Sequence, residues 1–239
     1  MDGLSIGMAT AAVGVAFVHT ALGPDHYLPF VALGRARGWS MRRTLSITAV
    51  CGVGHVLSSV VLGGLGVLAG VALGALSTVE GHRGDLAAWL LFGIGIAYAL
   101  WGVRRALRRH EGFELHTHGH GVHLHHGGGV MHVHAHHHHP RDAVRRQTTF
   151  WALFLVFVLG PCEPLIPLFM VPASEARWGV ALVLALVFGV ITLATMLAIT
   201  AALVAGVSRV PLGPLQRWAH AMAGGVMAAS ASAVLFLGL

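Results

Sequence analysis

The sequence contains little charge, no lysine and only two cysteines. Of its 239 residues 10% are charged and 56% are hydrophobic, and the mean hydropathy is +0.75. A soluble globular domain carries about a quarter charged residues. Both cysteines, Cys51 and Cys162, lie in apolar runs, so the sequence does not imply an extracellular disulfide framework. The composition predicts an integral protein of the cell membrane.

Hydrophobic runs long enough to cross about 30 Å of hydrocarbon, roughly 20 residues each, occur six times along the chain. They lie at residues 5–31, 44–74, 87–103, 150–171, 178–207 and 219–238. The first run lacks a small-residue cleavage site after a basic start, so we expect a retained span and not a signal peptide. The sequence thus predicts an all-α, multi-pass membrane protein with six transmembrane helices.

The positions of the basic residues predict how the chain is oriented in the membrane. All 15 are arginine, and most lie in the loops after the first, third and fifth runs, whereas only Arg83 and Arg177 lie in the other two. Short arginine-rich loops stay in the cytoplasm. We therefore expect these three loops to be cytoplasmic and both termini to lie outside. The basic charge does not indicate a nucleic-acid partner.

The two halves of the sequence look related. Residues 22–26 (LGPDH) align with residues 159–163 (LGPCE) at an offset of 137. Because each half holds three spans, the second copy enters the membrane from the opposite side, as in the inverted repeats of secondary transporters. We expect two three-helix repeats with proline-broken first and fourth helices, at 1–109 and 150–239, separated by a loop at 110–149.

The proline breaks carry the ionisable residues of the predicted spans. Asp25 and Glu163 are the only acidic residues there. An ionisable group at mid-bilayer costs at least about 2.5 kcal/mol unless it faces a protein interior or a water-filled path. The residues expected to converge near a pseudo-twofold axis are Asp25, His26, Cys162 and Glu163. Imidazole, carboxylate and one thiol together favour a borderline divalent transition metal over Ca²⁺ or Cu⁺.

Two further histidines are expected to line the approach to this site. On an unbroken helix His19 and His26 would stand about 10.5 Å apart along the axis, which is too far for one ion. Either the helix unwinds at the Gly-Pro break and brings them together, or they form successive stations on a path. His55 lies in the second run. A hydrogen bond to neighbouring backbone is the competing role for His19 and His55, and a structural hydrogen-bond network is the alternative for Asp25 and Glu163.

Residues 110–140 hold 13 of the 18 histidines, spaced by glycine and with little hydrophobic pattern. This composition predicts a disordered segment, and His-rich tracts bind metal ions. The lack of a fixed spacing indicates a loose cytoplasmic buffer for several ions, with a pH-responsive tract as the alternative. The histidines expected to buffer metal are His116, His118, His120, His123, His125, His126, His132, His134, His136, His137, His138 and His139.

These motifs resemble a known family. HTALGPDH, from His19 to His26, is similar to the first-helix signature of nickel/cobalt transporters, including NicO-type and urease-accessory permease-like proteins, as are His55 and the His-rich loop. GPCEPLIP, at residues 160–167, resembles the motif of cytochrome c biogenesis and DsbD-type electron carriers, which belong to the same LysE-like superfamily. The resemblance implies a six-helix scaffold, Ni²⁺ or Co²⁺ as substrate with no cofactor, and a metallochaperone or urease or hydrogenase maturation as context.

The sequence therefore predicts a secondary transporter of Ni²⁺ or Co²⁺ and not an enzyme. Asp25, His26 and Glu163 would bind the ion at the midplane, and a carboxylate that alternates between proton and metal would couple its flux to a proton gradient. The alternatives are a thiol-disulfide electron carrier that uses Cys51 and Cys162, and a LysE-like exporter of an amino acid or of an anion such as sulfite. The sequence has no GxxxxGK[ST] motif, so ATP would have to be used by another subunit.

Overall fold

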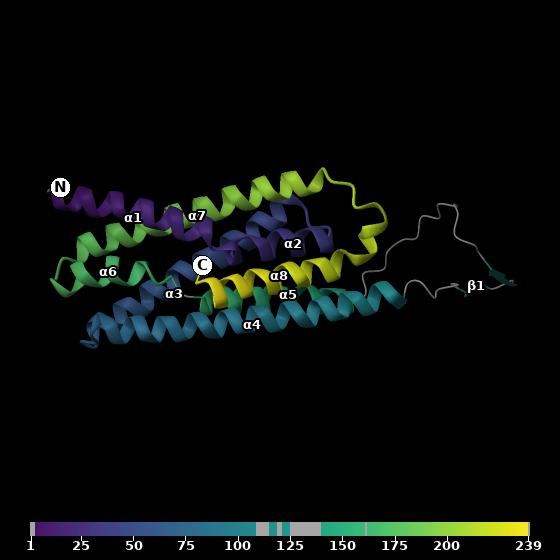
Figure 1. Ribbon diagram of the computed structural model, residues 1–239, viewed down its shortest axis with the longest axis horizontal. Coiled ribbons are helices and arrows are strands. Elements are labelled where there is room, and N and C mark those ends of the chain that lie inside the picture. Colours follow the sequence, from purple (N-terminus) through teal and green to yellow (C-terminus); the bar gives the residue numbers. More distant parts are fainter. Residues whose placement is uncertain (1–2, 109–114, 119–120, 125–139, 161, 239) are drawn as a thin grey trace.

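The chain folds into an elongated bundle of α-helices (Figure 1). The computed structural model describes residues 3–108, 115–118, 121–124, 140–160 and 162–238. The helices are α1 (Gly3–Leu22), α2 (Leu28–Arg37), α3 (Met41–Leu68), α4 (Leu73–Arg108), α5 (Pro140–Leu159), α6 (Leu165–Ser174), α7 (Trp178–Ser208) and α8 (Ala219–Leu237). The 3-10 helix η1 (Pro24–His26) joins α1 to α2, η2 (Gly213–Trp218) precedes α8, and strands β1 (Leu115–His118) and β2 (Gly121–Leu124) form a pair.

Four helical segments are long and apolar enough to cross a membrane: α3, α4, α7 and residues 213–237. A fifth candidate is a broken span formed by residues 7–22 and 24–37, with a bend of 80° between its parts. The prediction of a helical chain with several membrane-crossing segments is thus confirmed. The predicted fourth run is divided between the shorter apolar helices at the end of α5 and in α6. The count of six spans therefore stays a prediction.

The outer surface of the bundle carries many large apolar side chains. Leu186 on α7 is 69% exposed, and Val53 and Leu57 on α3 are 51% and 56% exposed. A soluble monomer rarely exposes so large an apolar surface, whereas lipid is as apolar as these side chains. Inside the bundle, buried side chains form two clusters, one containing Phe188 and the other Phe30. This distribution is that of a protein surrounded by lipid.

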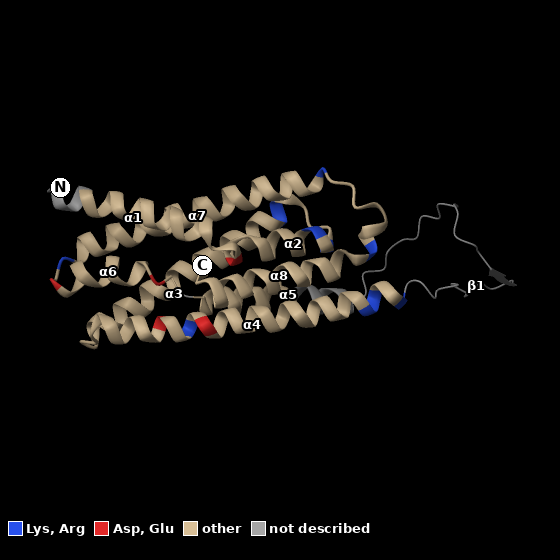
Figure 2. Ribbon diagram, in the orientation of Figure 1, with Lys and Arg blue, Asp and Glu red and all other residues tan. Residues whose placement is uncertain are grey.

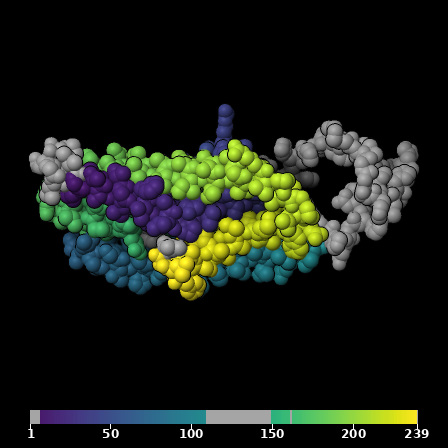
Figure 3. Space-filling model, turned by 45° about the horizontal axis from the view of Figure 1, so that its top comes forward, coloured from purple at the N-terminus to yellow at the C-terminus, as the bar shows by residue number. Residues whose placement is uncertain are grey.

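Helix boundaries recur at the same sequence offset as the two proline motifs. Helices α2 and α6 have the same length and begin at Leu28 and Leu165. The same offset separates Met41 from Trp178, the first residues of α3 and α7, and it also separates the last residues of α1 and α5. Helix α1 packs along α7 (Figure 3), and α5 packs against α3. Each half of the chain thus places its first helix against the long central helix of the other half.

Helices α4 and α8 pack with their backbones in contact. A Cβ atom on Gly95 would lie 2.6 Å from the backbone nitrogen of Ala228, and a Cβ atom on Gly102 or Gly224 would overlap the backbone of the facing helix. Small residues allow membrane helices to approach this closely. The glycines therefore fix α4 and α8 as a tightly packed pair beside the broken helices.

Most of the described arginines gather at one end of the bundle (Figure 2). Arg35 and Arg37 lie in the last turn of α2, Arg105 and Arg108 in the last turn of α4, and Arg217 in η2. Helix α4 ends and helix α5 begins at this same end (Figure 1). The arginines predicted from the sequence to share one side of the membrane thus lie together, and the assignment of that side to the cytoplasm stays a prediction.

Part of the histidine-rich segment forms a hairpin, which differs from the predicted disorder. Strands β1 and β2 pair antiparallel, with His116 opposite His123 and His118 opposite Gly121. A lone two-stranded hairpin is at best marginally stable in water. The other histidines expected to buffer metal lie outside the described residues: His120, His125, His126, His132, His134, His136, His137, His138 and His139. Metal buffering by this segment therefore stays a prediction.

Candidate metal-binding site

The break between α1 and α2 brings two histidines together. Proline cannot continue the hydrogen-bond ladder of α1, and the chain turns through η1, where the backbone nitrogen of His26 donates to the carbonyl of Gly23 at 3.1 Å. The ring centroids of His19 and His26 lie 4.9 Å apart. Of the two arrangements expected from the sequence, unwinding at the Gly-Pro break is therefore the one observed.

Helix α3 adds a third imidazole to this pair. The ring of His55 lies 5.2 Å from that of His26, edge to face, so that His26 contacts both of the other histidines. His26 and His55 are 4% and 3% exposed. Three imidazoles from α1, η1 and α3 are thus packed together inside the bundle.

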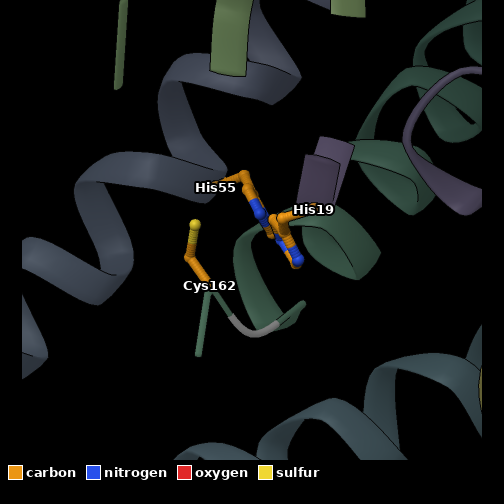
Figure 4. Close-up of side chains that lie close together, drawn as sticks. All are labelled: His19, His55 and Cys162. Carbon is orange, nitrogen blue, oxygen red and sulfur yellow. The ribbon is translucent and has the colours of Figure 1, made fainter. Parts of the chain in front are cut away.

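The second proline break supplies a sulfur atom. Cys162, in the turn between α5 and α6, is buried, and its backbone nitrogen donates to Ser59 Oγ on α3 at 3.3 Å. One ligand atom each of His19, His55 and Cys162 lies within 4.8 Å of the other two. Figure 4 shows these three side chains arriving from three different segments of the chain. The two proline-broken segments therefore contribute to one cluster.

Hydrogen bonds at Nδ1 fix the orientation of two of the rings. His55 Nδ1 lies 3.2 Å from the carbonyl oxygen of Phe157, and His26 Nδ1 lies 3.2 Å from the carbonyl oxygen of Gly23 and 3.1 Å from Asp25 Oδ1. A carbonyl oxygen only accepts, so Nδ1 carries the proton and donates in both rings. In a neutral ring Nε2 then keeps its lone pair, which is the arrangement of metal-binding histidines with an oxygen partner at the other nitrogen.

The Nε2 atoms of all three histidines are buried and have no hydrogen-bond partner among the described residues. Leaving a buried polar atom unpaired costs about 1–3 kcal/mol, so buried polar atoms normally have a partner. A metal ion bound by His19 and His55 together with Cys162, whose ligand atoms lie within 4.8 Å of one another, would supply a partner to two of these rings. The half-buried carboxylate of Asp25, held against His26, gives the cluster its negative charge. The arrangement can therefore bind a cation through nitrogen and sulfur donors.

The structure places Glu163 and two of the histidines differently from the arrangement expected from the sequence. Glu163 is exposed and lies beside α4, with Oε1 3.9 Å from the position of a Cβ atom on Gly81, so it points away from the histidines. Cys162 and Glu163 follow each other in an irregular turn, and only Cys162 faces inward. His19 and His55, predicted as approach residues, lie within the cluster, and Asp25 supports His26 from the side.

A buried ion pair beside the site was missed in the sequence. The third run was predicted to begin at residue 87, but α4 begins at Leu73, so Glu80 and Arg83 lie inside the helix. Glu80 is fully buried and accepts a 2.9 Å hydrogen bond from Arg83 Nη1. The prediction that Asp25 and Glu163 are the only acidic residues in the spans is therefore wrong. The available signal was an acid and a base three residues apart, which share a helix face.

Arg83 ties α4 to the end of α5 and to α3. Its guanidinium donates to the carbonyl oxygens of Leu159 at 3.1 Å and Gly160 at 3.0 Å, and to Ser58 Oγ at 3.0 Å. Carbonyls at a helix C-terminus lack partners within the helix and carry partial negative charge. Arg83 therefore fixes the C-terminal end of α5, which comes just before the turn that contains Cys162.

The two cysteines lie in separate parts of the core. Both are unpaired thiols. Cys51 belongs to the cluster that contains Phe30, whereas Cys162 belongs to the cluster that contains Phe188. Cys51 is therefore packed as a small apolar side chain, and Cys162 is the cysteine that faces the histidines.

Glycine at position 23 is required by the close packing of the break. A Cβ atom there would overlap His26 Nδ1 and lie 3.0 Å from Asp25 Oδ1. We expect Gly23→Ala to displace His26 and to weaken Co²⁺ binding by about tenfold or more, the effect typical of losing support around a metal ligand. Titration of the purified protein with Co²⁺, followed by its visible absorption bands, measures this.

Gly14→Ala is the matched control for this substitution, because nothing lies within 4 Å of a Cβ atom at position 14 of α1. Its Co²⁺ affinity should equal that of the unaltered protein. An affinity of Gly23→Ala within twofold of that value would contradict the geometry of the break.

Comparison of the chain with models of known protein families, with characterised proteins and with solved structures found no significant match. The resemblance of the two proline motifs to known transporters and electron carriers therefore stays a prediction.

Proposed function

We propose that this chain is a membrane transporter whose substrate is Ni²⁺ or Co²⁺, bound by His19, His26, His55 and Cys162. The observation that carries the proposal is the packing of His19, His26 and His55 against one another, with all three Nε2 atoms buried and without hydrogen-bond partners among the described residues. Two of these rings are held at Nδ1 by oxygen atoms. Asp25 stabilises the cationic complex through its hydrogen bond with His26.

The donor set supports a borderline transition metal. Imidazole suits Co, Ni, Cu and Zn, a thiolate adds softness, and Ca²⁺ and Mg²⁺ prefer oxygen ligands over the nitrogen and sulfur donors gathered here. Around a tetrahedral ion, nitrogen and sulfur donors lie about 3.3–3.6 Å apart. The donor atoms of His19, His55 and Cys162 lie within 4.8 Å of one another. Closure around the ion needs side-chain movements of about 1 Å, and the family resemblance selects Ni²⁺ and Co²⁺ within this group.

The position of the site supports transport over a purely structural metal site. Broken helices that meet at the midplane are a common feature of secondary transporters with inverted repeats. The recurrence of helix boundaries at the offset of the two proline motifs supports two such repeats, α1–α4 and α5–α8. In this arrangement α5 and α6 are the broken fourth of six spans, and rocking of one repeat against the other exposes the cluster to either side in turn.

The arginine-rich end of the bundle is proposed to face the cytoplasm, with both termini outside. Helix α4 ends and α5 begins at that end, so the histidine-rich segment connects the two there (Figure 1). In this orientation its histidines hold Ni²⁺ or Co²⁺ close to the inner opening of the transport path. The segment supplies ions for export or receives them after import.

The alternative functions require features that the described residues do not supply. An electron carrier needs two cysteines able to approach with Cα atoms less than about 7 Å apart, whereas Cys51 and Cys162 are packed in different clusters. An anion exporter needs positive charge at its substrate site, and here the charged group next to the histidines is the Asp25 carboxylate. No observation on the described residues favours either function over metal transport.

Uptake of Ni²⁺ and Co²⁺ into liposomes that contain the purified protein tests the proposal. We expect saturable uptake by the unaltered protein and uptake about tenfold or more slower for Asp25→Asn, because the amide loses the charge that supports His26 and the metal. Imposing a pH gradient should accelerate uptake by the unaltered protein more than by the variant if Asp25 exchanges proton for metal.

Asp85→Asn is the control, because Asp85 is an exposed carboxylate on α4. It should transport at the unaltered rate. The proposal is wrong if the unaltered protein moves neither Ni²⁺ nor Co²⁺, and the role of Asp25 is wrong if the two asparagine variants behave alike.

A further inference from the structure

A second polar cavity opens at the arginine-rich end of the bundle, away from the histidine cluster. It has a volume of about 590 Å³ and is lined by residues of α2, α3, α4 and α8 and of the turn between α2 and α3. Its basic and aromatic lining residues include Arg37, Arg43, Arg105, Trp39, Trp101 and His220. No carboxylate is among the described residues that line it. The described lining of the cavity is therefore basic.

The arginines in this cavity are held by aromatic rings. The guanidinium carbon of Arg43 lies 5.3 Å from the ring centroid of Trp39, and that of Arg105 lies 5.4 Å from Trp101. Stacking of this kind uses the face of the Arg43 guanidinium, so its N–H groups can bind an acceptor in the plane. Within the described chain, the Arg43 guanidinium has no hydrogen-bond acceptor. The cavity thus contains an oriented donor without an anionic partner.

Arg37, from α2, also lines the cavity and is fixed in the same way. Its guanidinium carbon lies 5.7 Å from the ring centroid of Tyr98, and its Nε donates to the Tyr98 hydroxyl at 3.4 Å. The hydroxyl in turn lies 2.8 Å from His220 Nδ1 on α8. This chain of contacts joins α2, α4 and α8 and sets the direction of the arginine. The guanidinium groups of Arg37 on α2 and Arg43 on α3 therefore both line this cavity.

The beginning of α3 adds to the positive field. Ser40, the N-cap residue of this 28-residue helix, and Arg43 in its first turn both line the cavity. Backbone N–H groups at a helix N-terminus carry partial positive charge and bind phosphate groups in many proteins. Fixed guanidinium groups and a helix N-terminus are together the donor set of a phosphate site.

We propose that this cavity binds a phosphate group, and that the headgroup of an anionic phospholipid supplies it. Tryptophan and tyrosine are enriched at the depth of the lipid headgroups, and the cavity is lined by Trp39, Trp101 and Tyr98 at the end of the membrane-crossing helices. Basic pockets between membrane helices bind headgroups of anionic lipids. The site is independent of metal transport, since it shares no residue with the histidine cluster.

Native mass spectrometry of the full chain in detergent, titrated with phosphatidylglycerol, tests the proposal. We expect saturable binding that is weaker by about tenfold in Arg43→Gln, the loss of one charge-assisted contact. Arg42→Gln is the matched control, because Arg42 is the exposed neighbour of Arg43 and does not line the cavity. Co²⁺ titration of each variant reports whether the remainder of the protein is folded.

Competition by inorganic phosphate separates the two sources of the group. Binding of phosphatidylglycerol that resists millimolar phosphate supports the lipid headgroup. Binding of phosphate alone, with displacement of the lipid and loss in Arg43→Gln, keeps the phosphate site and overturns the lipid source. Equal lipid binding by Arg42→Gln and Arg43→Gln, or lipid binding that never saturates, overturns the proposal.

Discussion

Replacing His55 by alanine is expected to lower the affinity of the protein for Ni²⁺ by at least about 100-fold, the upper end of the loss seen when only the support of a metal ligand is removed. His55 is the member of the cluster that helix α3 contributes, and its Nε2 is buried without a partner among the described residues. Its ring lies against His26, and its ligand atom is within 4.8 Å of those of His19 and Cys162. Without His55, helix α3 contributes no donor, and the ion is left to His19, His26 and Cys162.

His82→Ala is the matched control for this experiment. His82 is an exposed histidine of α4 whose Nδ1 is bonded to the carbonyl of Thr78 in its own helix at 2.7 Å. Equilibrium dialysis of the purified variants against Ni²⁺ should give the unaltered affinity for His82→Ala. Glu163→Gln should also retain its affinity, because the exposed carboxylate points away from the histidines.

A second substitution at position 55 separates loss of a ligand from loss of structure. His55→Cys keeps a metal-binding atom on α3, so we expect it to recover part of the affinity lost in His55→Ala. If alanine and cysteine at this position both bind Ni²⁺ as tightly as the unaltered protein, the histidine cluster is not the metal site.

The sequence predicted the break in the first helix and the residues on either side of it. Proline removes a backbone hydrogen bond wherever it stands inside a helix, so the interruption at Pro24 follows from residue type alone. The distance between His19 and His26 does not follow from residue type, because it depends on the backbone dihedral angles in η1 and on the 80° bend. The sequence therefore predicted both alternatives and could not choose between them.

The fourth predicted helix shows a second reason for errors at the site. In a regular helix the face that each residue occupies follows from its number, but Cys162 and Glu163 lie in an irregular turn where neighbouring side chains point in different directions. Charge favoured Glu163 as the ligand, and the turn instead directs Cys162 inward. Patterns of charge and hydropathy carry no information on such a turn.

The ion pair of Glu80 and Arg83 was not predicted because the start of the third helix was assigned from hydropathy alone.

Replacing Arg83 by glutamine is expected to destabilise the protein by about 3 kcal/mol, the lower end of the cost of leaving one partner of a buried pair without the other. The lower end applies because the Arg83 side chain remains 16% exposed, whereas that of Glu80 is fully buried. Thermal unfolding in detergent, followed by circular dichroism, measures the change.

Removing the second charge should reverse part of this loss. In the double variant with Glu80→Gln, no unpaired carboxylate remains at this place in the core, so we expect it to be more stable than Arg83→Gln alone. Arg177→Gln is the control, since Arg177 forms a wide 3.8 Å pair with the exposed Glu175, and its effect should stay below about 1 kcal/mol. Equal stability of Arg83→Gln and Arg177→Gln would falsify the structural role of the buried pair.

Arg83→Gln should also affect the metal site. Arg83 binds the last carbonyls of α5 and Ser58, and the neighbouring Ser59 accepts the backbone N–H of Cys162. When this anchor is lost, Cys162 is held less firmly, while His26 keeps its hydrogen bonds to Gly23 and Asp25. Arg83→Gln should therefore weaken the sulfur-to-metal absorption of bound Co²⁺ more than the visible bands that report the nitrogen ligands, which distinguishes loss of Cys162 from general unfolding.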